Sequence, residues 1–202
     1  NAYMQMHNVV HDVLGWLKSD FSDSTPSATK LFDKYNSSWD VNGPTDNAYA
    51  EDYKQIGKRL LEYLWETRQN KSLITPVEIK VPFPGGTVTI TPDEVTVDEV
   101  GVHRVRKIKS GKQLSTEFDQ VGYTLLIKAA EQQYGKGTIV EAIHLAGETH
   151  QSVSVTDKKQ ATRITNCQNA ISAISNGEFP AFPSARSCPT CPSFFLCGGV
   201  PS

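Results

Sequence analysis

The sequence predicts an α/β fold in which helices flank a central stretch of short β-strands, followed by a cysteine-rich C-terminal tail. Three observations predict this arrangement. Residues 76–109 are rich in Val, Ile and Thr and are punctuated by glycines, as short strands require. On both sides of this stretch, apolar residues recur at helical spacing. Residues 176–202 combine many Gly and Pro residues with three cysteines, so we expect little regular structure there.

The composition fits one globular core with an appended tail. A chain of 202 residues can bury a substantial core, and we assign residues 1–175 to the core and 176–202 to the tail. A hydrophobic content of 38% and a net charge of −2 argue against a disordered chain and against a globally basic nucleic-acid binder. Any contact with nucleic acid must therefore come from a local basic patch.

The sequence gives no sign of a membrane segment. It contains no apolar run near the roughly 20 residues that a membrane helix requires, and no signal peptide opens it. We therefore expect a cytoplasmic protein. Because the chain begins with Asn1 rather than Met, we also expect a fragment of a longer protein.

Two helices are expected before the strands. Residues 2–17 carry an apolar stripe of helical period. His7 and His11 lie four residues apart on one side of this helix, and three interpretations remain open: two partly exposed histidines, a two-histidine zinc site, or one histidine in a composite metal site. Residues 19–44 predict a loop or a pair of short helices, and a strong apolar stripe then predicts a packing helix that Asp46 caps.

The central stretch predicts a β-meander, with a Pro-Gly-Gly turn between its first two strands. Its strands are expected at Pro76–Phe83, Thr87–Ile90, Asp93–Val100 and Val102–Lys109. Beyond the meander we expect a helix that Ser115 or Thr116 caps and that runs to Tyr134, a strand at 138–144, its hairpin partner at 151–155, and a helix at 157–174.

Two positions in the meander have the residue types for chemistry. Asp93 follows Pro92, and Lys109 ends the last strand. Side chains two apart in a strand share a face, so Lys107 and Lys109 point one way and Arg106 the other. An acid on one strand with Asp-x-Lys on the next is how Mg²⁺-dependent nucleases hold a metal and orient the attacking water. Here the spacing is present, but position 107 is Lys.

The cysteines form the most concentrated motif. Cys188, Cys191 and Cys197 fall within ten residues, whereas Cys167 stands apart on the apolar stripe of its expected helix. In a cytosolic chain, such clustering indicates metal or cluster ligation rather than disulfides. Free thiols in a disordered end are the alternative.

Together these stretches resemble the RecB/AddB-like PD-(D/E)XK family, the C-terminal nuclease domain of UvrD-type helicases, over nearly the whole chain. Residues 9–14 resemble the helix that supplies a metal-binding histidine, and residues 77–83 the strand before the first acid. Asp93-Glu-Val resembles Asp-Arg-Val, and residues 107–112 stand where Asp-Tyr-Lys-Thr-Gly-Lys is expected. Residues 118–123 are similar to a helix carrying Gln and Tyr four apart, although Asp119 occupies the Gln position.

The resemblance implies a restriction-endonuclease-like fold, with a central mixed β-sheet flanked by helices and a Cys-rich C-terminal tail. It implies His11 and Asp93 as ligands of Mg²⁺ or Mn²⁺ and Lys109 as the catalytic lysine. Lys107 replaces the second metal-binding Asp, and we expect it to pair with Asp93 and to take roughly the space of the ion. In another strand register Glu78 supplies the missing acid, and Asp98 is the poorer candidate.

The resemblance also implies an iron–sulfur cluster of the 4Fe-4S type, which closes many such domains. Cys188, Cys191 and Cys197 would hold it. The family's first ligand precedes the histidine helix, where this sequence has no cysteine. The fourth ligand was then lost with a missing N-terminus or is supplied elsewhere. Zinc held with Cys167 or a histidine is the fallback, although a buried structural cysteine is the ordinary interpretation of Cys167.

Three functions follow. The first is a degenerate nuclease module that binds DNA or a helicase, in the same or a partner chain. Its candidate phosphate contacts are Arg104, Arg106, Lys107, Lys109 and Lys112, unless these only form a solvated strand edge. The second is an active Mg²⁺- or Mn²⁺-dependent DNA exonuclease that uses His11, Asp93, another acid and Lys109. The third is a zinc-binding interaction domain without enzymatic activity.

Overall fold

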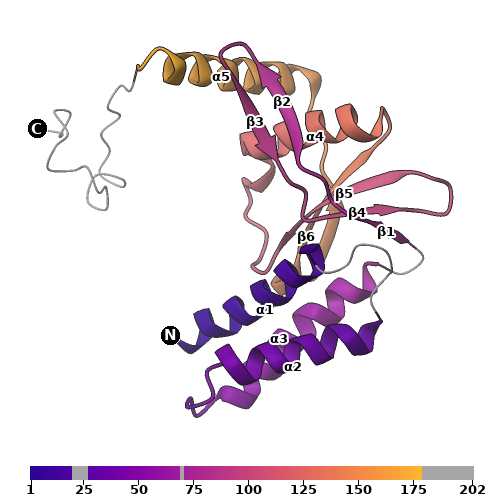
Figure 1. Ribbon diagram of the computed structural model, residues 1–202, viewed down its shortest axis with the longest axis vertical. Helices are drawn as coiled ribbons and strands as arrows, with labels where there is room; N and C mark the ends of the chain where they lie inside the picture. Colours follow the sequence, from indigo (N-terminus) through magenta and orange to yellow (C-terminus); the bar gives the residue numbers. More distant parts are fainter. Residues whose placement is uncertain (20–26, 69–70, 179–202) are drawn as a thin grey trace, which may run out of the picture.

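A five-stranded mixed β-sheet forms the centre of the protein. The computed structural model describes residues 1–19, 27–68 and 71–178 (Figure 1). The sheet has the order β1-β4-β5-β6-β7. Its strands are β1 (Ser72–Ile74), β4 (Glu94–Val97), β5 (His103–Lys109), β6 (Ile139–His144) and β7 (Thr149–Ser152). Only β5 and β6 pair in parallel, and the other neighbours are antiparallel. With helices on both faces, this arrangement confirms the expected fold class.

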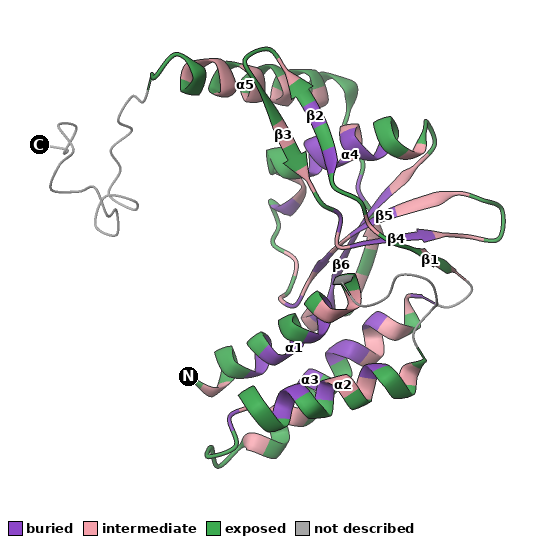
Figure 2. Cartoon of the chain, in the orientation of Figure 1, coloured by how far each residue is buried: buried purple, intermediate pink, exposed green. Residues whose placement is uncertain are grey.

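Three N-terminal helices cover one face of the sheet (Figure 1). They are α1 (Ala2–Ser19), α2 (Ala28–Asn42) and α3 (Ala50–Glu66). Their apolar stripes meet in a shared core, visible as buried positions on the facing sides of the helices (Figure 2). Ile108 of β5 and Ile143 of β6 extend this core into the sheet, which fixes the end of α1 beside the end of β5.

Helix α4 (Val121–Tyr134) covers the opposite face. Val105 of β5 and Val140 of β6 pack against Tyr123 and Leu126 of this helix. The two-residue alternation along β5 therefore works as expected: Val105 faces α4, whereas Ile108 faces the N-terminal helices. Lys107 and Lys109 are on the α4 side of the strand.

The predicted meander divides into two sheets. Strands β2 (Ile79–Phe83) and β3 (Gly86–Ile90) pair only with each other, whereas β4 and β5 join the central sheet. The expectation of one continuous meander was therefore wrong. The reason is packing: Ile79 and Val81 bury against Ala129 of α4 instead of continuing the ladder towards β4.

Several element boundaries also differ from expectation. A single helix, α2, follows Ser27, whose Oγ accepts the N–H of Lys30 at 3.2 Å, where a loop or two short helices was expected. Tyr49, not Asp46, precedes α3. A 3₁₀ turn, η1 (Glu117–Asp119), comes before α4, so that helix begins several residues after the expected caps.

Helix α5 (Asp157–Ser175) lies outside the main core and has no buried residue. It rests on the β2–β3 hairpin, where the Ser175 hydroxyl donates to the Gly85 carbonyl at 2.6 Å. Cys167 is a free, partly exposed thiol, so the expectation of a buried structural cysteine was wrong. Cys188, Cys191 and Cys197, the expected cluster ligands, lie outside the described residues. Among the residues that are described, no helix is long and apolar enough to cross a bilayer.

Candidate functional site

Asp93 directly precedes the interior strand β4, where four polar contacts hold it. Its backbone N–H donates to the Arg106 carbonyl at 3.1 Å, which places it beside β5. Its carboxylate accepts the N–H of Ile108 at 2.8 Å. Lys107 Nζ lies 3.0 Å from Oδ2, and Lys18 Nζ lies 2.5 Å from Oδ1. The carboxylate is only 8% exposed, so these contacts enclose it almost fully.

The two ammonium groups reach Asp93 from different elements. Lys107 comes from the middle of β5, and Lys18 comes from the last turn of α1. Lys18 follows His11 by seven residues, which places both on one side of α1. Sequence reasoning missed Lys18, although this spacing could have singled it out once His11 was under consideration.

His11 reaches the same place. The Asp93 cavity has a volume of about 300 Å³. It is lined by His11, Leu14, Gly15, Leu17, Lys18, Arg68, Asp93, Lys107 and Ile108. His11 Nε2 lies 3.1 Å from the Ser110 hydroxyl, in a hydrogen bond whose direction depends on the tautomer. The structure thus brings together His11, Asp93 and Lys107, as the sequence pattern indicated.

His7 has a different environment. It is buried, and its ring meets Tyr3 edge-on with centroids 4.4 Å apart. Burial, reinforced by His11, lowers the pKa of His7. His7 does not line the Asp93 cavity, so the two histidines do not act as a pair there.

The donor set around Asp93 does not fit a divalent metal ion. Mg²⁺ requires several oxygen ligands and carboxylate charge to offset its dehydration. Here one carboxylate faces two ammonium groups and a backbone N–H. In the part of the chain that the structure describes, no three His, Cys, Asp or Glu residues are grouped so that they could hold a metal.

Lys109 belongs to a second, adjoining cluster. Its ammonium forms an ion pair with Glu117 of η1, whose carboxylate also accepts the Tyr123 hydroxyl at 2.8 Å. Burial alone would raise the pKa of Glu117, but the hydrogen bonds from Lys109 and Tyr123 outweigh it and hold this pKa below its usual value. The same acid helps burial to raise the pKa of the Tyr123 hydroxyl.

His144 completes this cluster from β6. Its Nε2 lies 3.8 Å from Glu117, too far for a hydrogen bond, and its ring is fully buried. Burial, the largest cause, and then the positive charge of Lys109 lower the pKa of His144 against the opposing charge of Glu117. Glu117 therefore pairs as an anion with the Lys109 ammonium and accepts the Tyr123 hydroxyl.

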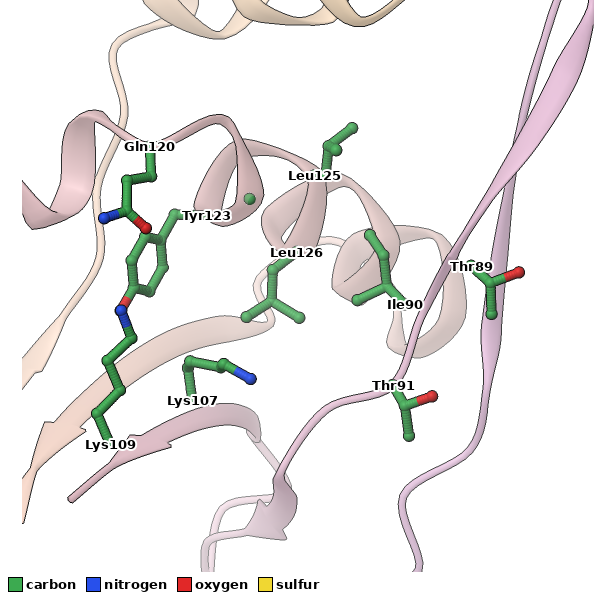
Figure 3. A pocket seen from close by; sticks show the side chains of 10 residues that line it. Thr89, Ile90, Thr91, Lys107, Lys109, Gln120, Tyr123, Leu125 and Leu126 are labelled. Carbon is green, nitrogen blue, oxygen red and sulfur yellow. The ribbon is translucent and has the colours of Figure 1, made fainter. Parts of the chain in front are cut away.

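A second cavity opens between β5 and α4 (Figure 3). This Tyr123 pocket has a volume of about 240 Å³. It is lined by Thr89, Ile90, Thr91, Lys107, Lys109, Gln120, Gly122, Tyr123, Leu125 and Leu126. Lys107 lines both cavities, so the Asp93 cavity and the Tyr123 pocket are neighbours on the two sides of one lysine.

The alternative acids lie elsewhere. Glu78 precedes β2 of the separate hairpin, pairs with Lys80 at 3.9 Å, and lines neither cavity. Asp98 follows β4 at the end opposite Asp93, where it pairs with Arg104 at 3.1 Å. Hydrogen bonds from the Val102 backbone and then from Arg104 lower the pKa of Asp98. Neither residue supplies a second acid next to Asp93.

The expected phosphate contact through Arg106 was wrong. Arg106 is 0% exposed, because it faces the N-terminal helices rather than an open strand edge. Its guanidinium binds Glu94 and the Thr67 carbonyl, and its Nε lies 3.3 Å from Glu141. Burial raises the pKa of Glu141, but hydrogen bonds from His150 and Arg104 outweigh this effect and lower the pKa to about 2.

The Arg104 guanidinium also forms ion pairs with two acids, Asp98 and, at 2.8 Å, Glu141. Its side chain is 25% exposed. Arg68 closes the buried network by pairing with Glu94. Among the predicted basic contacts, Lys107 and Lys109 are partly exposed and Lys112 is exposed. These three lysines, together with Lys18, are the accessible cations in and next to the two cavities among the residues that the structure describes.

One comparison with known proteins identifies the superfamily of the chain. A sequence profile of the PD-(D/E)XK nuclease superfamily matches residues 5–198. No curated protein matches the chain. The match spans the sheet, the N-terminal helices, Asp93 and the Lys107–Lys109 stretch of β5. The chain therefore belongs to the PD-(D/E)XK nuclease superfamily.

Proposed function

We propose that this nuclease-like domain binds DNA through its phosphates and does not cleave it. The observation that carries the proposal is the pair of ammonium groups on Asp93, with Lys107 Nζ at 3.0 Å and Lys18 Nζ at 2.5 Å. A phosphodiester-cleaving centre that relies on a divalent ion needs carboxylates at this place. An ammonium group in the position of the second acid adds positive charge to the site. It has no lone pair with which to bind a metal ion.

The Asp93 cavity and the Tyr123 pocket together form what is called the cleft below, and their charge balance favours an anionic ligand. In the Asp93 cavity, Lys18 and Lys107 outnumber the single carboxylate, while Arg68 is neutralised by Glu94. In the adjoining pocket, Lys109 is balanced by Glu117. The cleft therefore keeps an excess positive charge although the whole chain has a net charge of −2.

The three lysines of the two cavities are accessible. The side chains of Lys18, Lys107 and Lys109 are 40%, 41% and 35% exposed, respectively. Their flexible stems allow each ammonium to contact Asp93 or Glu117 and a phosphate oxygen together, since an ammonium has three donors. Each lysine that neutralises a phosphate releases a condensed counterion, so binding weakens as salt rises.

The cellular setting is part of the same proposal. The resemblance to RecB/AddB-like domains favours a module of a helicase–nuclease protein in DNA repair or recombination, with the helicase in the same or a partner chain. A 4Fe-4S cluster at Cys188, Cys191 and Cys197 belongs to this proposal. A brown protein with broad absorption near ~400 nm would support the cluster, and a colourless protein with bound zinc would favour the zinc-binding interaction domain.

A salt titration of DNA binding tests the proposal. We expect fluorescence anisotropy to show binding to a labelled oligonucleotide that weakens with NaCl. Lys18→Ala combined with Lys107→Ala lowers the affinity and reduces the slope of log K against log salt by about 0.7–0.9 for each phosphate that is no longer neutralised. The matched control is Lys80→Ala with Lys158→Ala, which removes the same charge from exposed positions outside both cavities.

The outcomes separate the candidate functions. An equal loss of affinity in the control pair would mean that net charge, not this cleft, holds the DNA. Release of acid-soluble nucleotides from linear DNA with Mn²⁺, abolished by Asp93→Ala, would instead establish the active exonuclease. That alternative has one favourable observation, which is that His11 and Asp93 line the same cavity.

A further inference from the structure

We propose that the Tyr123 pocket takes one unpaired nucleobase, so that the domain binds single-stranded DNA in preference to duplex. This inference rests on the proposed function, because the phosphate attached to that nucleotide is held by the lysines of the cleft. It adds a ligand class and a second subsite, on the α4 side of β5 and separate from the Asp93 cavity.

The pocket has the size and the walls for one ring system. Its volume of about 240 Å³ is below the roughly 300–1,000 Å³ of cavities that hold drug-sized ligands. Its apolar walls come from two elements: Ile90 ends β3, and Leu125 and Leu126 project from α4 (Figure 3). A flat aromatic base gains by leaving water for such walls.

Few polar groups of the pocket face its apolar walls. Gln120 contributes an amide from the side of η1 and α4, whereas Thr89 and Thr91 line the hairpin side with their hydroxyls turned outward (Figure 3). An amide both donates and accepts hydrogen bonds, so Gln120 can meet any base without strict selection. We therefore expect a preference for unpaired bases with little sequence preference.

The ring of Tyr123 is a fixed wall of the pocket. Its hydroxyl is committed to Glu117 at 2.8 Å, and Lys109 Nζ lies 5.9 Å from its ring centroid. The same lysine is in the pocket and in the ion pair with Glu117. The ordering of Tyr123 and Lys109 before binding means that little conformational entropy is lost when a base enters.

Lys107 connects the pocket with the phosphate site, because it lines both cavities. A nucleotide whose base enters the pocket therefore has its phosphate next to the ammonium groups of the cleft. A base within a duplex is paired and stacked, and must leave the helix before it can enter a side pocket. A single strand avoids most of that cost, and this difference produces the preference.

Gly122 is the position at which a substitution can obstruct the pocket without a steric clash. It lines the cavity in the first turn of α4, and a Cβ added there meets nothing within 4 Å. Because Gly122 is exposed at the rim of the pocket and its Cβ would point into open space, Gly122→Leu places its side chain where it obstructs entry to the pocket without a clash, and its melting temperature is expected to match or exceed that of the unmodified protein. Gln133→Leu is the control, since it adds the same side chain at an exposed position of α4 outside the pocket.

The test measures anisotropy with three labelled ligands of equal length: a single strand, a strand of abasic sites with the same phosphates, and a blunt duplex. We expect the unmodified protein and Gln133→Leu to bind the single strand at least about fivefold more tightly than the abasic strand, as base stacking against protein usually gives. Gly122→Leu loses this preference and retains abasic-strand and duplex binding. A 2-aminopurine in the strand changes its emission only when the pocket is open.

Two contrary results have different meanings. Equal binding of the single and abasic strands, or an unchanged preference in Gly122→Leu, overturns the nucleobase site and leaves phosphate binding intact. Failure to bind any of the three ligands at low salt overturns the proposed function, and with it the nucleobase site.

Discussion

Replacing Asp93 with Asn is expected to strengthen DNA binding, which is the reverse of its effect in a metal-dependent nuclease. A phosphate oxygen that contacts Lys107 on its open side lies about 6 Å from the carboxylate, because Nζ is 3.0 Å from Oδ2 and a charged hydrogen bond adds roughly 2.8 Å. Unit charges about 6 Å apart repel by about 0.7 kcal/mol in bulk water and about 2.8 kcal/mol at an effective dielectric constant of 20.

The lower value applies here, because Lys18 and Lys107 are 40% and 41% exposed and solvent screens the site. Removing the carboxylate charge is then worth about a threefold lower Kd at low salt, and the gain disappears at high salt. The variant is expected to be less stable by about 1–3 kcal/mol, because a buried carboxylate with three donors is removed.

The assay is anisotropy with a labelled single strand at low and high NaCl, together with thermal melting to confirm folding. Asp157→Asn is the control, because Asp157 is exposed at the start of α5 and lines neither cavity. Weaker binding by Asp93→Asn at low salt, with the control unchanged, would refute the reasoning, since it would show that Asp93 helps to hold the ligand.

Two further predictions concern the buried acids and arginines. The folded pKa of Glu117 lies below its ordinary value of 4.5, so its stabilising contribution is present above that pH and is lost as the pH falls through the folded pKa. Glu117→Gln is therefore expected to be less stable than the unmodified protein at pH 7, with a gap that narrows in melting curves recorded towards pH 3; a constant gap would contradict this. Arg106→Met leaves Glu94 and Glu141 short of a partner and is expected to cost about 3–5 kcal/mol in urea unfolding, whereas Lys112→Met, at an exposed position, changes stability little. Equal effects of the two substitutions would mean that the buried network contributes nothing.

Sequence patterns predicted what depends on local periodicity. The helical stripe of residues 2–17 and the alternation along β5 predicted which side chains meet the core, and the spacing of Asp93 and Lys107 brought them to one place. The Val- and Thr-rich strands were also located, to within a few residues. Each of these properties follows from a repeat of two or of 3.6 residues.

Properties that depend on pairing between distant segments escaped prediction. Arg106 was expected to contact phosphate or to belong to a solvated strand edge, yet Glu94 on β4 and Glu141 on β6 compensate its charge inside the protein. Glu117 carries no local signal, since its role depends on the 3₁₀ turn that places it beside Lys109 and Tyr123. The separation of the β2–β3 hairpin likewise depends on its packing against α4.

Manganese binding measured by electron paramagnetic resonance tests most directly whether ammonium groups have taken the place of a metal. Comparing the unmodified protein with Asp93→Ala isolates this site from any metal bound by the cysteines at 188, 191 and 197. We expect the two to bind Mn²⁺ identically, and Lys107→Asp, which gives the site a second carboxylate, to gain a further bound ion. Loss of one bound Mn²⁺ in Asp93→Ala relative to the unmodified protein would contradict the account.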